Sequence, residues 1–132
     1  MRIVIDSNIF VSSFFWGGNP RKIFDRVIDG LDELYITDEI LKEILDVMSR
    51  KKFDLELQKA IDYVNIIDQY SFKVVSKDNS ENISRDKDDN KIISCGINGK
   101  VDCIISGDND LLILKEYSGI RIMSPKEYLG SL

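Results

Sequence analysis

The stretch that decides the fold is Ile3-Val4-Ile5-Asp6-Ser7-Asn8. Its three β-branched residues predict a short buried strand, and the polar residues that follow favour a turn or the cap of a helix. The same arrangement returns later in the chain, where Cys103-Ile104-Ile105 runs into Ser106-Gly107-Asp108. Each of these two strands is therefore expected to end close to an aspartate.

Strands and helices are expected to alternate along the rest of the chain. Further strands are predicted at 34–36, 72–75 and 120–122, and helices at 19–30, 37–52, 55–67, 89–98 and 124–128, with a short helix over 109–114. The apolar stretch 9–16 is ambiguous between helix and strand. The alternation predicts an α/β fold: a three-layer sandwich in which a parallel sheet of about five strands is flanked by helices.

Local signals predict where three of the helices begin. Asn19 is expected to be an N-cap, with Pro20 at the first helical position. Thr37 is expected to cap the helix that follows it, and Ser124 to cap a last short helix that starts with Pro125.

The composition is that of an ordinary globular domain. The chain has 132 residues, of which 43% are hydrophobic and 31% are charged, and no linker or repeat divides it, so residues 1–132 are expected to form one domain. No apolar run approaches the roughly 20 residues that a membrane span needs. Because the N-terminal stretch reaches Asp6 after three apolar residues, no signal peptide is expected, and a cytoplasmic protein is predicted.

Histidine is absent, and this excludes several kinds of chemistry. Ser-His-Asp and Cys-His catalysis and histidine zinc sites cannot be formed within this chain. Cys95 and Cys103 lack metal-ligand spacing and are expected in the core. The net charge of −5 disfavours non-specific binding of nucleic acid, so such a role would need local basic patches or a bound cation.

Carboxylates therefore carry the remaining chemistry, and they gather at one edge of the predicted sheet, where parallel strands end and helices begin. Each alone could be a helix cap or a solvated charge. Together they would repel, by about 4 kcal/mol for a pair 4 Å apart near a surface, so a bound cation is expected. Oxygen ligands favour Mg²⁺ or Mn²⁺. The acids are Asp6, Glu43, Asp86, Asp88, Asp89, Asp108 and Asp110.

Within this set, Asp6, Asp89 and Asp108 are expected to lie within reach of one metal ion, with Glu43 at the rim. Small polar residues beside the acids, Ser7, Asn8 and Ser106, could orient a ligand carboxylate or a metal-bound water. Turn and cap formation would explain the same three residues equally well.

The sequence resembles the PIN domain family over nearly the whole chain, from Ile3 to about Tyr128. The resemblance is closest to the prokaryotic branch of toxin components of toxin–antitoxin systems, the VapC-like ribonucleases, of which the segment Arg50-Lys51-Lys52-Phe53 is also typical. The motifs that carry it are Val4-Ile5-Asp6-Ser7-Asn8, Glu43 within Ile40-Leu41-Lys42-Glu43-Ile44-Leu45, Asp86-Lys87-Asp88-Asp89-Asn90, and Ser106-Gly107-Asp108-Asn109-Asp110-Leu111-Leu112.

This resemblance implies an endoribonuclease that depends on Mg²⁺ or Mn²⁺ and acts on RNA. It also implies a homodimer and, for a toxin, a cognate antitoxin as partner. The family's four acids correspond to Asp6, Glu43, Asp89 and Asp108, and supporting positions correspond to Asn8, Ser106, Asp86 and Asp110.

Two other functions remain as alternatives. The chain could be a catalytically inert PIN-like module that binds RNA or a partner, although the intact set of acids argues against an idle site. It could also be a Mg²⁺-dependent phosphatase, but the haloacid type requires a second aspartate where Asn8 stands. For RNA binding, the basic patches are Arg21-Lys22 and Arg50-Lys51-Lys52, although solvated residues at helix ends are the better explanation of both. The aromatic run Phe14-Phe15-Trp16 could stack on bases, although a place in the core or in a dimer interface explains it better.

Overall fold

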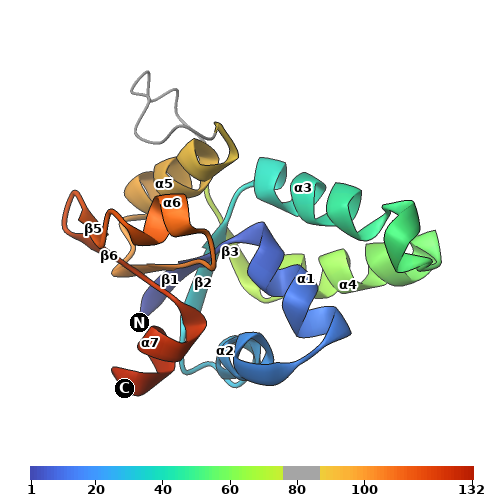
Figure 1. The fold of residues 1–132 in the computed structure, drawn as a ribbon, viewed down its shortest axis with the longest axis horizontal. Helices are drawn as coiled ribbons and strands as arrows, with labels where there is room; N and C mark the ends of the chain where they lie inside the picture. Colours follow the sequence, from blue (N-terminus) through green and yellow to red (C-terminus); the bar gives the residue numbers. More distant parts are fainter. Residues whose placement is uncertain (76–86) are drawn as a thin grey trace.

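A mostly parallel sheet runs through the centre of the protein (Figure 1). The structure is a computed structural model that describes residues 1–75 and 87–132. Across the sheet the strands are ordered β3-β2-β1-β4-β6-β5, and of the described pairs only β5–β6 is antiparallel. The predicted α/β architecture is therefore confirmed. The strands are β1 (Arg2–Ile5), β2 (Glu33–Ile36), β3 (Ser71–Lys73), β4 (Cys103–Ile105), β5 (Glu116–Tyr117) and β6 (Ile120–Met123).

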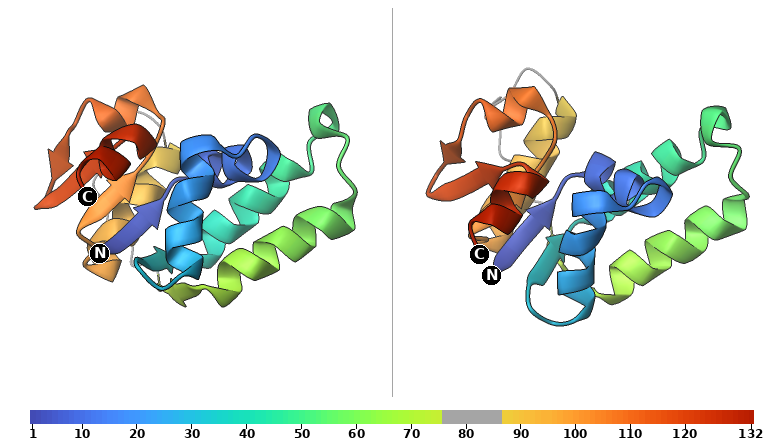
Figure 2. Two further views of the ribbon diagram at one scale, coloured as in Figure 1. Left: turned by 90° about the horizontal axis from the view of Figure 1, so that it is seen from below. Right: turned by 60° about the horizontal axis from the view of Figure 1, so that its bottom comes forward.

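Helices flank this sheet: α5 packs against β1, β2 and β4, whereas α7 packs against β6 and α2. Helices α3 and α4 run side by side away from the sheet, with the short 3-10 helix η1 at their far end (Figure 2). Among the described residues, none of the helices is long and apolar enough to cross a bilayer. The helices are α1 (Ser7–Phe15), α2 (Gly18–Ile28), α3 (Asp38–Met48), η1 (Lys51–Phe53), α4 (Leu57–Gln69), α5 (Lys87–Gly99), α6 (Asn109–Leu112) and α7 (Pro125–Gly130).

The two central strands, β1 and β4, form the middle of the core. Residues 3–5 and 103–105 are all buried, as expected for parallel strands covered on both faces. Cys95 and Cys103 are buried free thiols, and burial raises the pKa of each to about 12. Both cysteines therefore fill the core, as the sequence predicts.

Helix α5 lies close to β4 because a glycine stands at their contact. A Cβ atom on Gly96 would lie 3.0 Å from Ile104 Cδ1 and 3.4 Å from Val101 Cγ2. A side chain at this position would push α5 away from the sheet unless its neighbours shifted. This close packing sets the distance between β4 and α5, the helix that carries Asp89.

Two of the three predicted helix caps are confirmed. Thr37 Oγ1 accepts a hydrogen bond from the Ile40 amide (3.2 Å), and Ser124 forms a reciprocal capping box with Glu127. The prediction that Asn19 caps its helix is wrong, since α2 already begins at Gly18. The residue before Gly18, Gly17, has φ +73°, a left-handed conformation that glycine adopts readily.

Two elements were not recognised in the sequence. The ambiguous apolar stretch is helix α1, which starts at Ser7. Strand β5 was missed; it forms a hairpin with β6 through Ser118 and Gly119, whose φ angles are +53° and +80°. Positive φ at both positions is typical of the two-residue turns that join antiparallel strands.

A buried ion pair joins the end of α2 to the start of β2. The Asp32 side chain is fully buried and accepts hydrogen bonds from Arg26 Nε (2.9 Å) and from the Met1 amino group (3.1 Å). Burial raises the pKa of Asp32, but the hydrogen bonds from Arg26 and the Met1 amino group, together with the charge of Arg26, outweigh burial and hold that pKa below its usual value.

The Asp32→Asn variant is expected to lose about 2 kcal/mol of its free energy of unfolding at pH 7, because Arg26 keeps its charge without a partner. Since the folded-state pKa is lowered, this stabilisation is complete above the unfolded-state pKa of about 3.9 and is lost as the pH falls through the folded-state pKa. Urea denaturation at pH 7 and in strong acid measures the difference, which should shrink in acid. Asp29→Asn, an exposed control, should match wild type; an equal loss in both variants would contradict the prediction.

Candidate metal centre

The register of the two central strands brings Asp6 and Ser106 together. Strands β1 and β4 are parallel with Ile5 opposite Ile105, so the residue after each strand emerges at the same edge. The Asp6 amide continues the ladder by donating to the Ile105 carbonyl (2.9 Å). Beside it, the fully buried Ser106 hydroxyl donates to Asp6 Oδ2 (2.8 Å).

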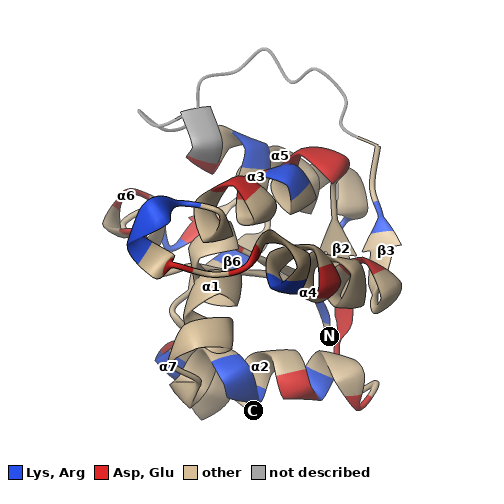
Figure 3. Cartoon of the chain, turned by 90° about the vertical axis from the view of Figure 1, so that its right-hand side faces the viewer, with Lys and Arg blue, Asp and Glu red and all other residues tan. Residues whose placement is uncertain are grey.

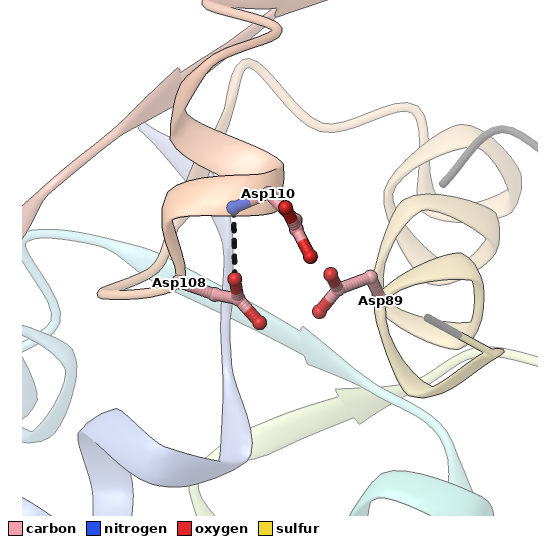
Figure 4. Close-up of side chains that lie close together, drawn as sticks. All are labelled: Asp89, Asp108 and Asp110. Carbon is pink, nitrogen blue, oxygen red and sulfur yellow. Dashed lines mark hydrogen bonds between the residues drawn. The ribbon is translucent and has the colours of Figure 1, made fainter. Parts of the chain in front are cut away.

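Three aspartates form a compact cluster next to this edge. Asp89 on α5, Asp108 at the N-cap of α6 and Asp110 in the first turn of α6 each place a carboxylate oxygen within 4.8 Å of the other two. Figure 4 shows the Asp89 and Asp110 carboxylates facing one another across the space between α5 and α6. The residue Asp89 is buried, with 3% exposed, and the other two are half-buried. We call these three residues the aspartate cluster.

Hydrogen bonds join Asp6 to this cluster. The Ser106 hydroxyl that donates to Asp6 also accepts from the Asp108 amide (3.0 Å), and Asp108 Oδ1 accepts from the Asp110 amide (2.9 Å). Asp108 thus caps α6, whereas the Asp6 side chain makes no capping hydrogen bond to α1. Helix capping alone therefore accounts for Asp108 but not for Asp6.

The environment of Asp6 disfavours its charged form. Burial raises the pKa of Asp6, and the negative charge of Asp108 raises it further. The hydrogen bond from Ser106 and the backbone amides of Ser7 and Asn8 act in the opposite direction without reversing the shift. A cation at this edge would offset both unfavourable effects.

Glu43 is held from a different direction. The Ser7 hydroxyl, at the start of α1 and almost fully buried, donates to Glu43 Oε2 (2.6 Å) on α3. Helix α3 contacts both α1 and α5, so Glu43 is carried toward the same edge by packing between helices. The neighbouring Asn8 is exposed on α1.

The three carboxylates that lie together in the structure are not the same three that the sequence predicted as metal ligands. Asp89 and Asp108 are brought together, and Asp110, expected in a supporting position, is the third member of the cluster. Asp6 lies beside them through Ser106. Asp86 lies outside the described residues, as does the side chain of Asp88. The Asp108–Asp110 spacing across a helix start was the signal that could have indicated Asp110.

The donor set of the aspartate cluster fits a hard divalent cation. It offers only carboxylate oxygens, which Mg²⁺ and Mn²⁺ prefer, and no described sulfur or nitrogen ligand that would favour zinc. When bound, such an ion acts as a Lewis acid that activates water and stabilises negative charge on phosphate oxygens. Asp89, Asp108 and Asp110 are the residues that would hold it, with Asp6 adjacent.

Fold and site together define an α/β protein with an acidic centre at the carboxyl edge of a parallel sheet. A family model described as PIN domain matches residues 2–110, so the chain belongs to the PIN domain family. It is 29% identical to an uncharacterised protein of Methanocaldococcus jannaschii over 98% of this chain and 90% of that protein. Its fold is similar to that of a chain in the crystal structure of VapBC2 from Rickettsia felis bound to a promoter DNA fragment, with a TM-score of 0.65. The two chains are 12% identical in sequence, and the match covers 92% of this chain and 97% of that chain.

Proposed function

We propose that this protein, as a single domain over residues 1–132, is an endoribonuclease that hydrolyses RNA phosphodiester bonds with the help of Mg²⁺ or Mn²⁺. The observation that carries the proposal is the aspartate cluster in a member of the PIN domain family. Clustered carboxylates at a sheet edge suit a metal-assisted reaction on a phosphate ester, and the absence of histidine removes the most frequent general base.

The proposed catalytic residues are Asp6, Glu43, Asp89 and Asp108. Asp89 and Asp108 would bind the metal ion together with Asp6 or Asp110, since all these carboxylates lie at one edge. Ser106 would keep Asp6 in one orientation. Glu43, oriented by Ser7, would accept a hydrogen bond from the attacking water and so position it.

We further propose that the protein is the toxin of a toxin–antitoxin pair and works in the cytoplasm as a homodimer. The likeness of its fold to the VapBC2 structure supports the toxin–antitoxin role, and the sequence resemblance to the VapC-like branch implies the homodimer. The partner would then be a cognate antitoxin. Co-expression with the product of an adjacent gene, followed by co-purification, tests this part of the proposal.

The direct test is cleavage of single-stranded RNA by the purified protein. We expect cleavage with Mn²⁺ or Mg²⁺ and none when a chelator is present, because the carboxylates alone supply no Lewis acid. Undiminished cleavage in the chelator would overturn the metal-dependent mechanism. Turnover of a phosphate monoester without RNA cleavage would favour the phosphatase alternative, and RNA binding with no cleavage would favour the inert module.

A further inference from the structure

Three aromatic side chains meet at the end of the molecule remote from the sheet. Phe15 and Trp16, at the end of α1, contact Phe53 of η1. The rings of Phe15 and Phe53 stack with centroids 4.5 Å apart, and the Trp16 ring lies 5.6 Å from Phe15. Trp16 is 71% exposed, so its indole face is available to a ligand. We call Phe15, Trp16 and Phe53 the aromatic tip.

Three basic residues directly precede Phe53 of the aromatic tip in the chain. Arg50, Lys51 and Lys52, here called the basic cluster, are all exposed, and Lys52 Nζ lies 5.0 Å from the centre of the Phe53 ring. Within residues 1–75 and 87–132, none of these three cations forms an ion pair. Figure 3 faces this end of the molecule and shows the block of basic residues where the chain leaves α3, followed by acids on the way to α4.

A shallow depression of about 380 Å³ connects the basic cluster to the acidic edge of the sheet. It runs along α3 from Glu39 to Val47, about 12 Å at the helical rise per residue, and reaches Arg50 beyond the end of that helix. Helix α5 contributes Lys91 on the other side. The residues that line the depression are Glu39, Lys42, Glu43, Asp46, Val47, Arg50 and Lys91.

These features match what a single strand of nucleic acid needs better than what a protein partner needs. Proteins that bind single strands combine cations along the phosphate backbone with exposed aromatic faces on which bases stack. Protein interfaces, by contrast, are depleted in lysine. Because the whole chain carries a net charge of −5, RNA would also require a local concentration of cations such as this one.

We propose that the basic cluster and the aromatic tip hold single-stranded RNA beside the acidic centre, with one base stacked on Trp16 and phosphates on the basic cluster and on Lys42 of the α3 depression. The choice of RNA rests on the proposed function. The location follows from the exposure of Trp16, the exposed cations of the basic cluster and the depression that runs from Arg50 past Glu43. Double-stranded RNA would not satisfy this surface, because its bases are already stacked on each other.

Trp16 is the single tryptophan of the chain, so its fluorescence reports directly on this surface. A short unstructured RNA is titrated into the protein in chelator, where no metal-dependent cleavage takes place. We expect quenching of the Trp16 emission by RNA and none by inorganic polyphosphate, which has phosphates but no bases. Quenching by both ligands, or by neither, would overturn the stacking of a base on Trp16.

Variants separate stacking from charge when binding is followed by the anisotropy of labelled RNA. Trp16→Ala should weaken binding about tenfold, since one base–aromatic stack is lost, and Trp16→Phe should restore most of it. Replacing Lys51 and Lys52 together by alanine should reduce the slope of log affinity against log salt by about 1.4. The matched controls Phe72→Ala and Arg121→Gln, exposed residues on β3 and β6, should bind like wild type.

Two further results would overturn the proposal. One is equal affinity of Trp16→Ala and wild type for RNA. The other is a Trp16 emission that shifts with protein concentration while the sedimentation mass doubles, which would make the aromatic tip a contact between two copies of the chain. RNA binding in chelator without any metal-dependent cleavage would leave this surface intact and reject only the proposed ribonuclease activity.

Discussion

Replacing Asp108 by asparagine is expected to lower metal-dependent RNA cleavage about 1,000-fold while the protein stays folded. A neutral amide is a weaker ligand than a carboxylate, and several kcal/mol of transition-state stabilisation depend on the metal ion, at about 1.4 kcal/mol for each factor of ten. The fold should survive because Asp108 also caps α6 through the Asp110 amide, and asparagine caps a helix as well as aspartate does.

The measurement compares initial cleavage rates of wild type, Asp108→Asn and Asp29→Asn at saturating Mn²⁺. Asp29 is an exposed aspartate at the end of α2, so its replacement removes the same charge away from the acidic edge. Circular dichroism should show three folded proteins. Equal rates for Asp108→Asn and wild type would exclude Asp108 from the centre and with it the proposed use of the aspartate cluster.

Replacing Asp6 by asparagine should lower cleavage about 100-fold and make the metal-free protein more stable. The loss of activity is of the size seen when a group in or next to a metal shell is removed. The gain in stability, about 1 kcal/mol, comes from removing a buried charge that lies near Asp108. Ser106 can still donate its hydrogen bond to the amide oxygen, so the edge of the sheet should keep its geometry.

Melting curves in chelator and at increasing Mn²⁺ test this second expectation. Metal binding to the folded state raises wild-type stability by mass action, so the wild-type shift should grow with Mn²⁺ concentration and exceed that of Asp6→Asn. Asp29→Asn should respond like wild type. If wild type and Asp6→Asn have the same melting temperature in chelator and the same response to Mn²⁺, Asp6 does not take part in the proposed centre.

Features that depend on neighbouring residues in the chain were predictable from the sequence. The buried strand at residues 3–5, the Thr37 cap and the Ser124 capping box follow from short segments whose side chains and backbone interact locally. The alternation of strands and helices also indicated that acids following β1 and β4 would share one edge of the sheet. The prediction of an α/β fold with a parallel sheet depended on these local signals.

Local sequence patterns did not predict the secondary structure where the same residues are compatible with several conformations. Residues 9–16, which form most of α1, are apolar on most sides because other helices cover α1, and they therefore show no period that distinguishes helix from strand. The N-terminal end of α2 is set by the left-handed backbone of Gly17 and not by the asparagine two residues later. Strand β5 has only two residues, too few to show an alternation.

By itself, the sequence determined which residue types are available for chemistry and at which edge of the sheet they emerge: acids without histidine, following parallel strands. Only the tertiary structure decided that Asp110 joins Asp89 and Asp108, that Ser106 holds Asp6, and that Phe53 meets Trp16. The physical reason is that the two kinds of feature depend on different interactions. Strand ends are positioned by backbone hydrogen bonds that any sequence of this pattern forms, whereas contacts between carboxylates or rings depend on how closely helices pack, as Gly96 allows for α5.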